Sequence, residues 1–355
     1  MRAPLVLHVL PVDLARGAQT YARELRTALD GAAVRHRTLT LFAGPAGALQ
    51  PDWALTVPDG PLRRAGVDPR AVLRLRRLLR HEDPAVVVVH GSEPLKYAVL
   101  AGVPRERVVA LKIGANHTRL GGARGWVYRT LLLRAGAVVA VSEAAADEAR
   151  SYGVAASALR VIPNGRDPAA FHVHRPAAVF PVHLVWVGHL DDAKRPLRFL
   201  EIVGALRSSG TEVRASVAGD GPLLDRVRAA ATDAVKVLGR VDDIPSLLAE
   251  SDVLVLTSAP NEGMPGVLIE AGMAGLPAVA TDVPGAADVI ENDATGFVVA
   301  VDDFDALVGA TRRLVEDEGL RARLGAAARA RCVERFGLDT SLRAWEALFA
   351  ERVSR

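Results

Sequence analysis

The sequence predicts an α/β protein with parallel sheets, and three observations lead to that expectation. Short apolar runs alternate along the chain with longer segments of helical periodicity, which is the pattern of strands joined by crossover helices. At 355 residues the chain is long enough for two domains. The stretch from Asn164 to Pro181 is rich in Pro, Ala and His, lacks periodicity, and is interpreted as a linker between the halves.

The expected strands follow from the apolar runs of strand length in each half. In the first half they are Leu5–Leu10, Arg37–Phe42, Ala85–His90, Val108–Ile113, Ala137–Val141 and Leu159–Ile162. In the second half they are Val182–Val187, Glu212–Ala218, Val235–Leu238, Val253–Leu256, Ala278–Ala280 and Phe297–Val299. Each half therefore has enough strands for a sheet of its own.

The composition is that of a soluble globular protein, with 50% hydrophobic and 24% charged residues. The single cysteine, Cys332, excludes an internal disulfide and argues against a thiolate metal cluster. No apolar run approaches the length of a membrane span. The N-terminal run PLVLHVLPV lacks a small-residue cleavage site, so it is interpreted as a first strand and not as a signal peptide. A cytoplasmic location is expected.

Charge is distributed unevenly along the chain. Residues 1–170 contain 24 Lys+Arg and 14 Asp+Glu, a net charge of +10, whereas residues 171–355 contain 20 and 27, a net charge of −7. The most basic segment, Arg70–His81, has helical spacing with leucines on one side and is interpreted as a solvated helix face. The alternative is peripheral contact with anionic lipid at the inner membrane face, or with an acidic acceptor. No aromatic platform accompanies the arginines, so nucleic acid is not an expected partner.

The most informative stretch is NEGMPGVLIEAGMAGLPAVATDVPG, which spans Asn261–Gly285. Glu262 and Glu270 flank a Gly/Pro-rich turn that opens an apolar helix, and Pro265 suits its first position. The first N–H groups of that helix are expected to be unpaired and to bind an anion such as phosphate. These are the N–H groups of Gly266, Val267 and Leu268. Because carboxylates accept hydrogen bonds from sugar hydroxyls, this helix end predicts a nucleotide-sugar site.

This stretch resembles the E-x7-E signature of the retaining glycosyltransferases of the GT-B fold, family 4 (glycosyl transferases group 1). In that family the first glutamate contacts the donor sugar and the second contacts the ribose. The resemblance therefore implies a catalytic role for Glu262 and a donor-binding role for Glu270, with Met264, Pro265 and the helix N–H groups completing the donor site.

The resemblance also implies the architecture, namely two facing, doubly wound Rossmann-like domains with an interdomain cleft. Residues 1–168 are expected to form the acceptor-binding domain and residues 169–337 the donor-binding domain. Residues 338–355 are expected to form a helix that crosses back to the first domain.

A second segment, VWVGHLDDAKRPLRFL (Val185–Leu200), resembles the family motif in which an arginine and a lysine five positions later hold the donor diphosphate. Lys194 matches the lysine and is assigned a catalytic role. His189 stands where the arginine is expected, and its imidazole lacks the permanent charge and forked geometry of a guanidinium. Gly188 and Arg195 complete the donor-binding residues of this turn.

Two further loops of the second half resemble donor-binding segments of the family. VAGDGPLLDRV provides Gly219, where the absence of a side chain lets a ligand come close to the backbone. VKVLGRVDD provides Gly239 and Arg240, which are assigned to the nucleobase. The acidic pairs Asp191–Asp192 and Asp242–Asp243 are interpreted as helix-start residues, so no metal site is expected.

The first half resembles the family less closely. Gly17, in VDLARGAQT, matches a glycine-rich loop near the diphosphate. His117, in KIGANHTRLGG, is assigned a catalytic contact with the donor sugar, and His90 is a second candidate at the same sheet edge. Ser142 is predicted to be a helix N-cap. Arg166, in VIPNGRD, replaces a residue that is usually aliphatic in the family.

The resemblance implies transfer of a hexose-type sugar from a UDP- or GDP-sugar to an acceptor hydroxyl, without a metal and by front-face displacement. The acceptor would be a glycan, a glycolipid or a small natural product. The alternatives are a nucleotide-sugar epimerase of the same fold and a non-catalytic sugar-nucleotide-binding protein. A nicotinamide dehydrogenase is disfavoured, because no strand is followed by G-x-G-x-x-G with a later acidic residue.

Overall fold

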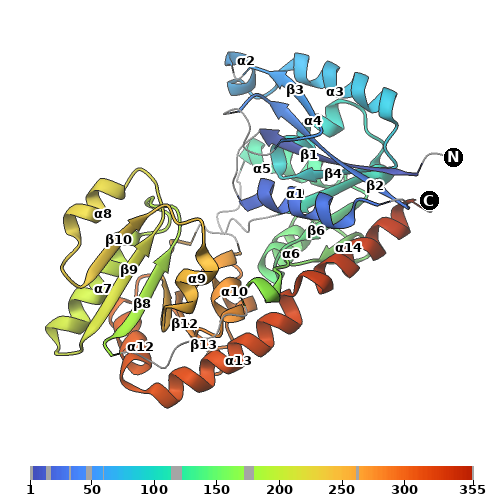
Figure 1. Ribbon diagram of the computed structural model, residues 1–355. Helices are drawn as coiled ribbons and strands as arrows, with labels where there is room; N and C mark the ends of the chain where they lie inside the picture. Colours follow the sequence, from blue (N-terminus) through green and yellow to red (C-terminus); the bar gives the residue numbers. More distant parts are fainter. Residues whose placement is uncertain are drawn as a thin grey trace. The chain divides into compact units, whose positions relative to one another are not determined.

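The computed structural model describes residues 3–12, 17–31, 33–44, 50–58, 60–112, 122–171, 180–260 and 264–353. The chain divides into two compact units (Figure 1). The N-terminal unit comprises the described residues up to Lys112, residues 122–164, and the chain from Ser341 onward. The C-terminal unit comprises the described residues from Gly165 to Thr340.

The N-terminal unit is built on a seven-stranded sheet in the order β3-β2-β1-β4-β5-β6-β7, with every pairing parallel. The strands are β1 (Leu5–Val12), β2 (Arg35–Phe42), β3 (Trp53–Val57), β4 (Val86–His90), β5 (Val108–Lys112), β6 (Ala137–Ala140) and β7 (Leu159–Val161). The helices are α1 (Gly17–Leu29), α2 (Pro61–Arg64), α3 (Pro69–Glu82), α4 (Ser92–Leu100), α5 (Gly122–Leu132), α6 (Glu143–Ser151) and α14 (Leu338–Val353).

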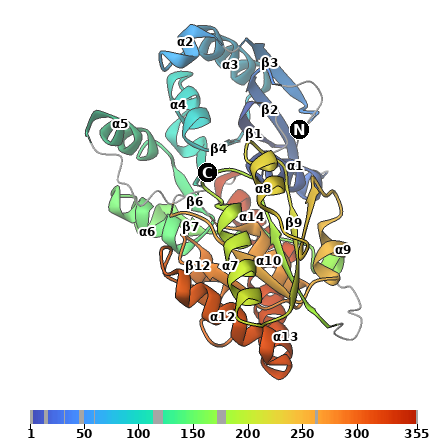
Figure 2. The ribbon, with the colours of Figure 1, turned by 90° about the vertical axis from the view of Figure 1, so that its left-hand side faces the viewer.

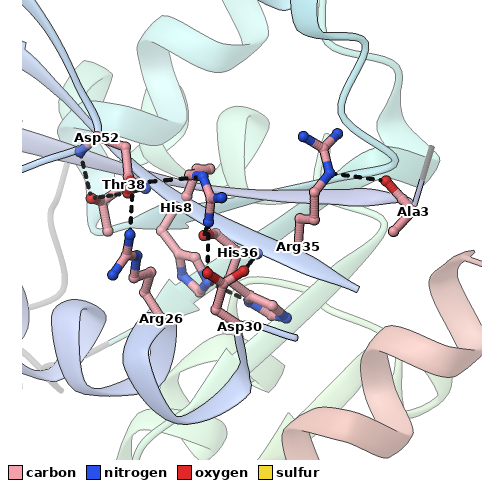
Figure 3. A network of polar contacts seen from close by, with 9 residues as sticks. Ala3, His8, Arg26, Asp30, Arg35, His36, Thr38 and Asp52 are labelled. Atoms are coloured by element: carbon pink, nitrogen blue, oxygen red, sulfur yellow. Dashed lines mark hydrogen bonds and ion pairs between the residues drawn. The ribbon is translucent and has the colours of Figure 1, made fainter. Parts of the chain in front are cut away.

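The edge strand β3 is absent from the sequence-based prediction. It is five residues long, and only Leu55 and Val57 are buried, so it offers too short an apolar pattern to recognise. Asp52, just before it, fixes its place. The Asp52 carboxylate accepts hydrogen bonds from the Thr38 backbone N–H at 2.8 Å and from Arg26 Nη2 at 2.8 Å, which ties the strand to β2 and α1 (Figure 3).

The last helix, α14, packs within the N-terminal unit. Its residues Trp345, Leu348 and Phe349 are buried, with the i, i+3, i+4 spacing of one helix face. Trp345 Nε1 donates to the Tyr21 hydroxyl at 2.8 Å, and that hydroxyl lies 3.2 Å from Ser341 Oγ. A buried polar network therefore joins α14 to α1.

The C-terminal unit is built on a six-stranded sheet in the order β10-β9-β8-β11-β12-β13, again with every pairing parallel. The strands are β8 (Val182–Val187), β9 (Val213–Ala218), β10 (Val235–Gly239), β11 (Val253–Leu256), β12 (Ala278–Thr281) and β13 (Gly296–Val299). The helices are α7 (Pro196–Ser208), α8 (Leu224–Ala230), α9 (Ile244–Ala249), α10 (Gly266–Met273), α11 (Ala286–Val289), α12 (Phe304–Glu316) and α13 (Glu318–Phe336).

Both faces of the second sheet are buried, as expected for a parallel sheet covered by helices. Leu184 and Trp186 of β8 belong to one core cluster together with residues of α7 and α12, and these two helices pack against each other (Figure 2). Val185 belongs to a second cluster with residues of α9, α10 and α13. This alternation along β8 follows from the two-residue period of a strand.

The fold class predicted from the sequence is confirmed. Each predicted strand is present with small shifts at its ends, and the basic segment Arg70–His81 lies in α3. Ser142 is an N-cap, as predicted, and Asp243 begins α9; they accept hydrogen bonds from the N–H groups of Ala145 and Ser246. The prediction that Asp191 and Asp192 begin a helix is wrong, because the next helix, α7, starts at Pro196 with Arg195 as its N-cap. Within the described residues, no helix is long and apolar enough to cross a membrane.

Candidate functional site

The strand order of the C-terminal sheet creates a topological switch point between β8 and β11. The chain passes from β8 through β9 to β10 on one side, then returns to the other side of β8 to form β11. In open parallel sheets, ligands bind beyond the carboxyl ends of the strands at such a point. The described parts of the segments that follow β8 and β11 are residues 188–195, 257–260 and 264–265. They include the predicted site residues Gly188, His189, Lys194, Arg195, Met264 and Pro265.

The turns after β8, β9 and β10 are joined by backbone hydrogen bonds. Gly219 lies at their centre: its N–H donates to the Gly239 carbonyl at 2.7 Å, and a Cβ at this position would lie 1.8 Å from the Gly188 oxygen. Leu190 N–H also donates to the Asp220 carbonyl at 2.9 Å. With a φ of +151°, Gly219 has a conformation that other residues rarely adopt. Glycine is therefore required at position 219 for packing between two turns of the chain.

The turn that contains Lys194 is held by the end of β11. Thr257 Oγ1 accepts a hydrogen bond from Trp186 Nε1 at 3.0 Å and lies 2.9 Å from the Arg195 carbonyl and 3.1 Å from that of Lys194. Ala259 N–H donates to the carbonyl of residue 193 at 2.7 Å. No sequence pattern predicts this role of Thr257, whose only signal is its place directly after an apolar strand.

Lys194 is partly buried in this turn. Burial lowers the pKa of its ammonium group from the usual 10.5 to about 8, and the nearby Asp191 carboxylate opposes that shift. The backbone N–H of Lys194 donates to Asp191 Oδ1 at 3.0 Å, which fixes the start of the side chain. Lys194 therefore provides a positioned cation that is mostly charged at neutral pH.

His189 and Arg195 are the two other candidates of this turn. His189 is exposed and lies in the same turn as Lys194. Arg195 has a left-handed backbone conformation with φ 49°, and its Nη1 pairs with Asp302 Oδ1 at 3.2 Å. Arg195 also lines a hollow of about 290 Å³ with Arg198 and Arg226. Its guanidinium is thus engaged on the side of α7.

Helix α10 begins one residue later than predicted. Pro265 is the N-cap, with extended dihedrals of φ −77° and ψ 102°, and Gly266 is the first helical residue. The prediction that Leu268 has an unpaired N–H is wrong, because this group donates to the Pro265 carbonyl at 3.1 Å and closes the first turn. Among the described residues, the N–H groups of Gly266 and Val267 have no acceptor. In the described part of the chain, two N–H donors at this helix end therefore have no acceptor.

Glu270 forms an ion pair that the sequence did not predict. Arg166 Nε donates to Glu270 Oε1 at 2.9 Å, and the side chains are 24% and 19% exposed. The two residues are 104 positions apart, so no local pattern could reveal the contact. The one available signal was the arginine at a position that the resemblance gives as aliphatic.

The remaining predicted residues are less informative or fall outside the described chain. Glu262 and His117 lie outside the described residues. Met264 is half-buried, Gly239 ends β10 with φ +70°, and Arg240 is exposed with its Nε 3.2 Å from Asp242 Oδ1. In the part of the chain that is described, no group of three or more His, Cys, Asp or Glu side chains is arranged to hold a metal ion.

Ser258 adds a polar group that sequence reasoning missed. It follows Thr257 at the carboxyl end of β11 and is fully buried. Its Oγ has no hydrogen-bond partner among the described residues. Buried hydroxyls are rarely left unsatisfied, so this hydroxyl is a hydrogen-bonding group without a partner in the described part of the chain.

The N-terminal sheet has a corresponding switch point between β1 and β4, where Gly17 begins α1 and His90 ends β4. His90 Nε2 lies 3.1 Å from His8 Nδ1, and His8 Nε2 lies 3.1 Å from His36 Nδ1. Figure 3 shows His36 beside His8 and Asp30. Burial lowers the pKa of His90 to about 3 and that of His36 to about 4, and it lowers the pKa of His8 well below the usual 6.5. The three imidazoles therefore form a neutral hydrogen-bonded chain.

Comparison with known proteins agrees with this architecture. Residues 15–170 match the family described as Glycosyltransferase Family 4, and residues 181–317 match Glycosyl transferases group 1. An exopolysaccharide phosphotransferase of Streptomyces coelicolor is 29% identical over 325 residues, covering 88% of this chain and 32% of that protein. The UDP-Gal:alpha-D-GlcNAc-diphosphoundecaprenol alpha-1,3-galactosyltransferase of Escherichia coli is 30% identical over 184 residues, covering 46% of each. The chain thus spans less than half the length of both relatives.

Solved structures share the fold of the whole chain. The crystal structure of HepE from Anabaena in complex with UDP-glucose has a TM-score of 0.80 and 19% identity, covering 98% of this chain and 99% of that one. This likeness confirms the GT-B fold, in agreement with the two parallel sheets and their strand orders. With both of its halves matched and this fold, the chain belongs to the GT-B glycosyltransferases of family 4 and group 1.

Proposed function

We propose that the chain is a retaining hexosyltransferase that moves a sugar from a nucleoside-diphosphate donor to an acceptor hydroxyl. The observation that carries the proposal is the switch point of the C-terminal sheet. There Lys194, held by Thr257 and Asp191, lies in the segment after β8, and the open N–H groups of α10 follow β11. A positioned ammonium group, together with two N–H donors that have no acceptor among the described residues, provides the charge complement of a diphosphate.

The proposed reaction requires stabilisation of a leaving group. The bond between the anomeric carbon and the donor phosphate oxygen breaks, and the bond from the acceptor oxygen forms on the same face of the sugar. The acceptor proton passes to the leaving phosphate, so no separate protein base is needed. Lys194 and the α10 N–H groups stabilise the negative charge that develops on the diphosphate without a metal ion. Glu262 and His117 are proposed to orient the sugar, and Glu270 the ribose.

The relatives support a choice of donor and acceptor. HepE was crystallised with UDP-glucose, and the Escherichia coli relative is named for transfer from UDP-Gal to a diphosphoundecaprenol-linked sugar. We therefore propose a UDP-sugar as the first donor to test, with a GDP-sugar second. A glycan or glycolipid is the first acceptor class, with a small natural product second.

Peripheral membrane contact through α3 is part of this proposal. Leu73 is 66% exposed on this helix, beside the exposed arginines Arg74, Arg76 and Arg77. Exposed leucine among arginines is suited to the headgroup region of an anionic bilayer. Vesicle flotation with and without anionic lipid tests the contact, and equal flotation with neutral vesicles would argue against it.

The proposed function is tested by combining a binding panel with a turnover assay. Thermal shifts are measured with UDP, GDP, ADP and their glucose or mannose conjugates, since a ligand that binds only the folded state raises the melting temperature. Release of diphosphate is then measured with and without a panel of acceptors, in buffer containing EDTA. Acceptor-dependent turnover with retained configuration supports the proposal.

The rival functions give different results in the same assay. Conversion of the donor sugar without any acceptor would indicate an epimerase. Selective binding without turnover for any acceptor would favour the non-catalytic binding protein. Activity lost in EDTA and restored by a divalent metal would contradict the metal-independent mechanism.

A further inference from the structure

We propose that Arg166 is a positioning residue for the donor ribose, acting through Glu270. This inference rests on the proposed function and deepens it, because it identifies the group that orients the ribose-binding carboxylate. Arg166 Nε donates a hydrogen bond to Glu270 Oε1 at 2.9 Å. Among the described residues, the second carboxylate oxygen has no protein partner, so it remains available to a ribose hydroxyl.

The backbone of Arg166 is fixed from both sides. Its N–H donates to the Phe336 carbonyl at 2.9 Å, and its carbonyl accepts from the Leu338 N–H at 2.8 Å, which forms a parallel bridge with Gly337. The side chain adds a bond from Nη1 to the Gly165 carbonyl at 3.2 Å. An arginine anchored in this way loses little further freedom when it holds Glu270, so the pair is preorganised.

The guanidinium also lies against the open end of α10. A Cβ at Gly266 would lie 2.9 Å from Arg166 Nη2 and 3.7 Å from Glu270 Oε1. The N–H of Gly266 is one of the two open donors of that helix. Glycine at position 266 therefore leaves room for the arginine at the start of α10. Arg166, Glu270 and the start of α10 converge on one place.

The physical effect expected of Arg166 is on orientation. A carboxylate held through one oxygen by a charge-assisted hydrogen bond presents the other oxygen in a defined direction. Without the arginine, Glu270 would have to be ordered by the ligand itself, and that cost would weaken ribose binding. Because the ribose does not take part in bond breaking, the effect should fall on donor binding and leave the chemical step unchanged.

The test compares nucleotides that differ only in the ribose hydroxyls. Titration calorimetry measures the affinity of UDP and GDP, each beside its 2′,3′-dideoxy form, for the wild-type chain, Arg166→Leu and Arg166→Lys. The matched control is Arg207→Leu, which removes an exposed arginine paired with Asp233 at 2.5 Å in the same unit.

We expect Arg166→Leu to weaken the affinity for the nucleotides with an intact ribose roughly tenfold, consistent with the loss of one charge-assisted hydrogen bond to Glu270. The affinity for the dideoxy nucleotides should not change. Arg166→Lys should restore part of the difference, since one ammonium can still reach a carboxylate oxygen. The control should match the wild type for both forms. In turnover, Arg166→Leu should raise KM for the donor with little change in kcat.

Other outcomes would overturn this role. Equal weakening of both forms would show that Arg166 acts on the phosphates or on the fold, and no weakening would show that it has no part in donor binding. Ligand-free melting curves establish that each variant is folded, and if Arg166→Leu does not fold, Arg166→Lys carries the same comparison. Failure of the wild type to bind either diphosphate would instead overturn the proposed donor site itself.

Discussion

Lys194 should make transfer depend on pH in the alkaline range. The perturbation is a rise in pH through the pKa of its ammonium group, which burial lowers from 10.5 to about 8. Below that value the ammonium is charged and can stabilise the leaving diphosphate. Above it the charge is lost, so activity should fall as the pH rises.

The size of the expected fall in rate follows from the Lys194 pKa of about 8. The charged fraction of Lys194 is about nine-tenths at pH 7 and about one-tenth at pH 9, so the rate should fall nearly tenfold between them. Lys194→Met removes the charge at every pH and should lower kcat roughly 100- to 1,000-fold, as for the loss of one transition-state donor. Lys194→Arg keeps its charge through this range and should abolish the alkaline fall even if its rate is lower.

The assay measures diphosphate release from a UDP-sugar from pH 6 to 10, at donor concentrations well below KM and with saturating acceptor, so that the rate reports kcat/KM and the pKa of the ligand-free chain. Melting temperatures are measured in parallel. Because the folded-state pKa of Lys194 lies below its usual 10.5, the unfolded chain binds more protons between about pH 8 and 10.5. The contribution of this lysine to stability therefore rises with pH over the window where activity falls. A flat rate profile to pH 10, or an unchanged alkaline fall in Lys194→Arg, would refute the reasoning.

Three further predictions concern both units. Replacing exposed His189 with arginine adds a permanent charge and a forked donor, so the KM for donor should fall several-fold; an unchanged or higher KM would mean that position 189 does not face the diphosphate. Gly219→Ala should lower the melting temperature and abolish donor binding, because its Cβ would lie 1.8 Å from the Gly188 oxygen, whereas Gly309→Ala, which meets nothing within 4 Å, should be tolerated. The buried histidine chain predicts that unfolding free energy is highest above about pH 6.5 and falls as the pH drops toward the folded-state values of about 4 for His36 and about 3 for His90. His36→Asn, which cannot titrate, should lose less stability between pH 7 and 4.5 in urea titrations than the wild type, and an equal loss would assign the acid sensitivity to other groups.

Much of the fold could be predicted because its determinants are local. The unbroken apolar runs of β8 and β11 stand out in the sequence, and the Gly-Asp-Gly composition of the turn at Gly219 marks it as a turn. Strand β3 could not be predicted, because Trp53–Val57 has only two buried residues, lies at the sheet edge, and is held in place by Asp52 contacts with β2 and α1. Tertiary contacts, and not the strand's own pattern, determine its structure.

The candidate site divides in the same way. Lys194 and Glu270 could be proposed as site residues from motifs, because each lies in a short segment that resembles the family. The contacts that orient Glu270 and lower the pKa of Lys194 could not be predicted from the sequence. Arg166 reaches Glu270 across 104 residues, and the burial that lowers the pKa of Lys194 depends on how separate turns pack together. The pairing of Leu268 N–H with Pro265 also depends on the backbone angles at the cap, which the sequence does not specify.

The most direct test of the central claim is hydrogen–deuterium exchange of the wild-type chain with and without saturating UDP. The account predicts slower exchange in two segments at the switch point, namely residues 188–195 after β8 and residues 264–270 at the start of α10. Slower exchange there that disappears in Glu270→Ala would support a nucleotide site at the carboxyl edge of the C-terminal sheet. Binding without protection of either segment, or protection confined to the N-terminal unit, would contradict it.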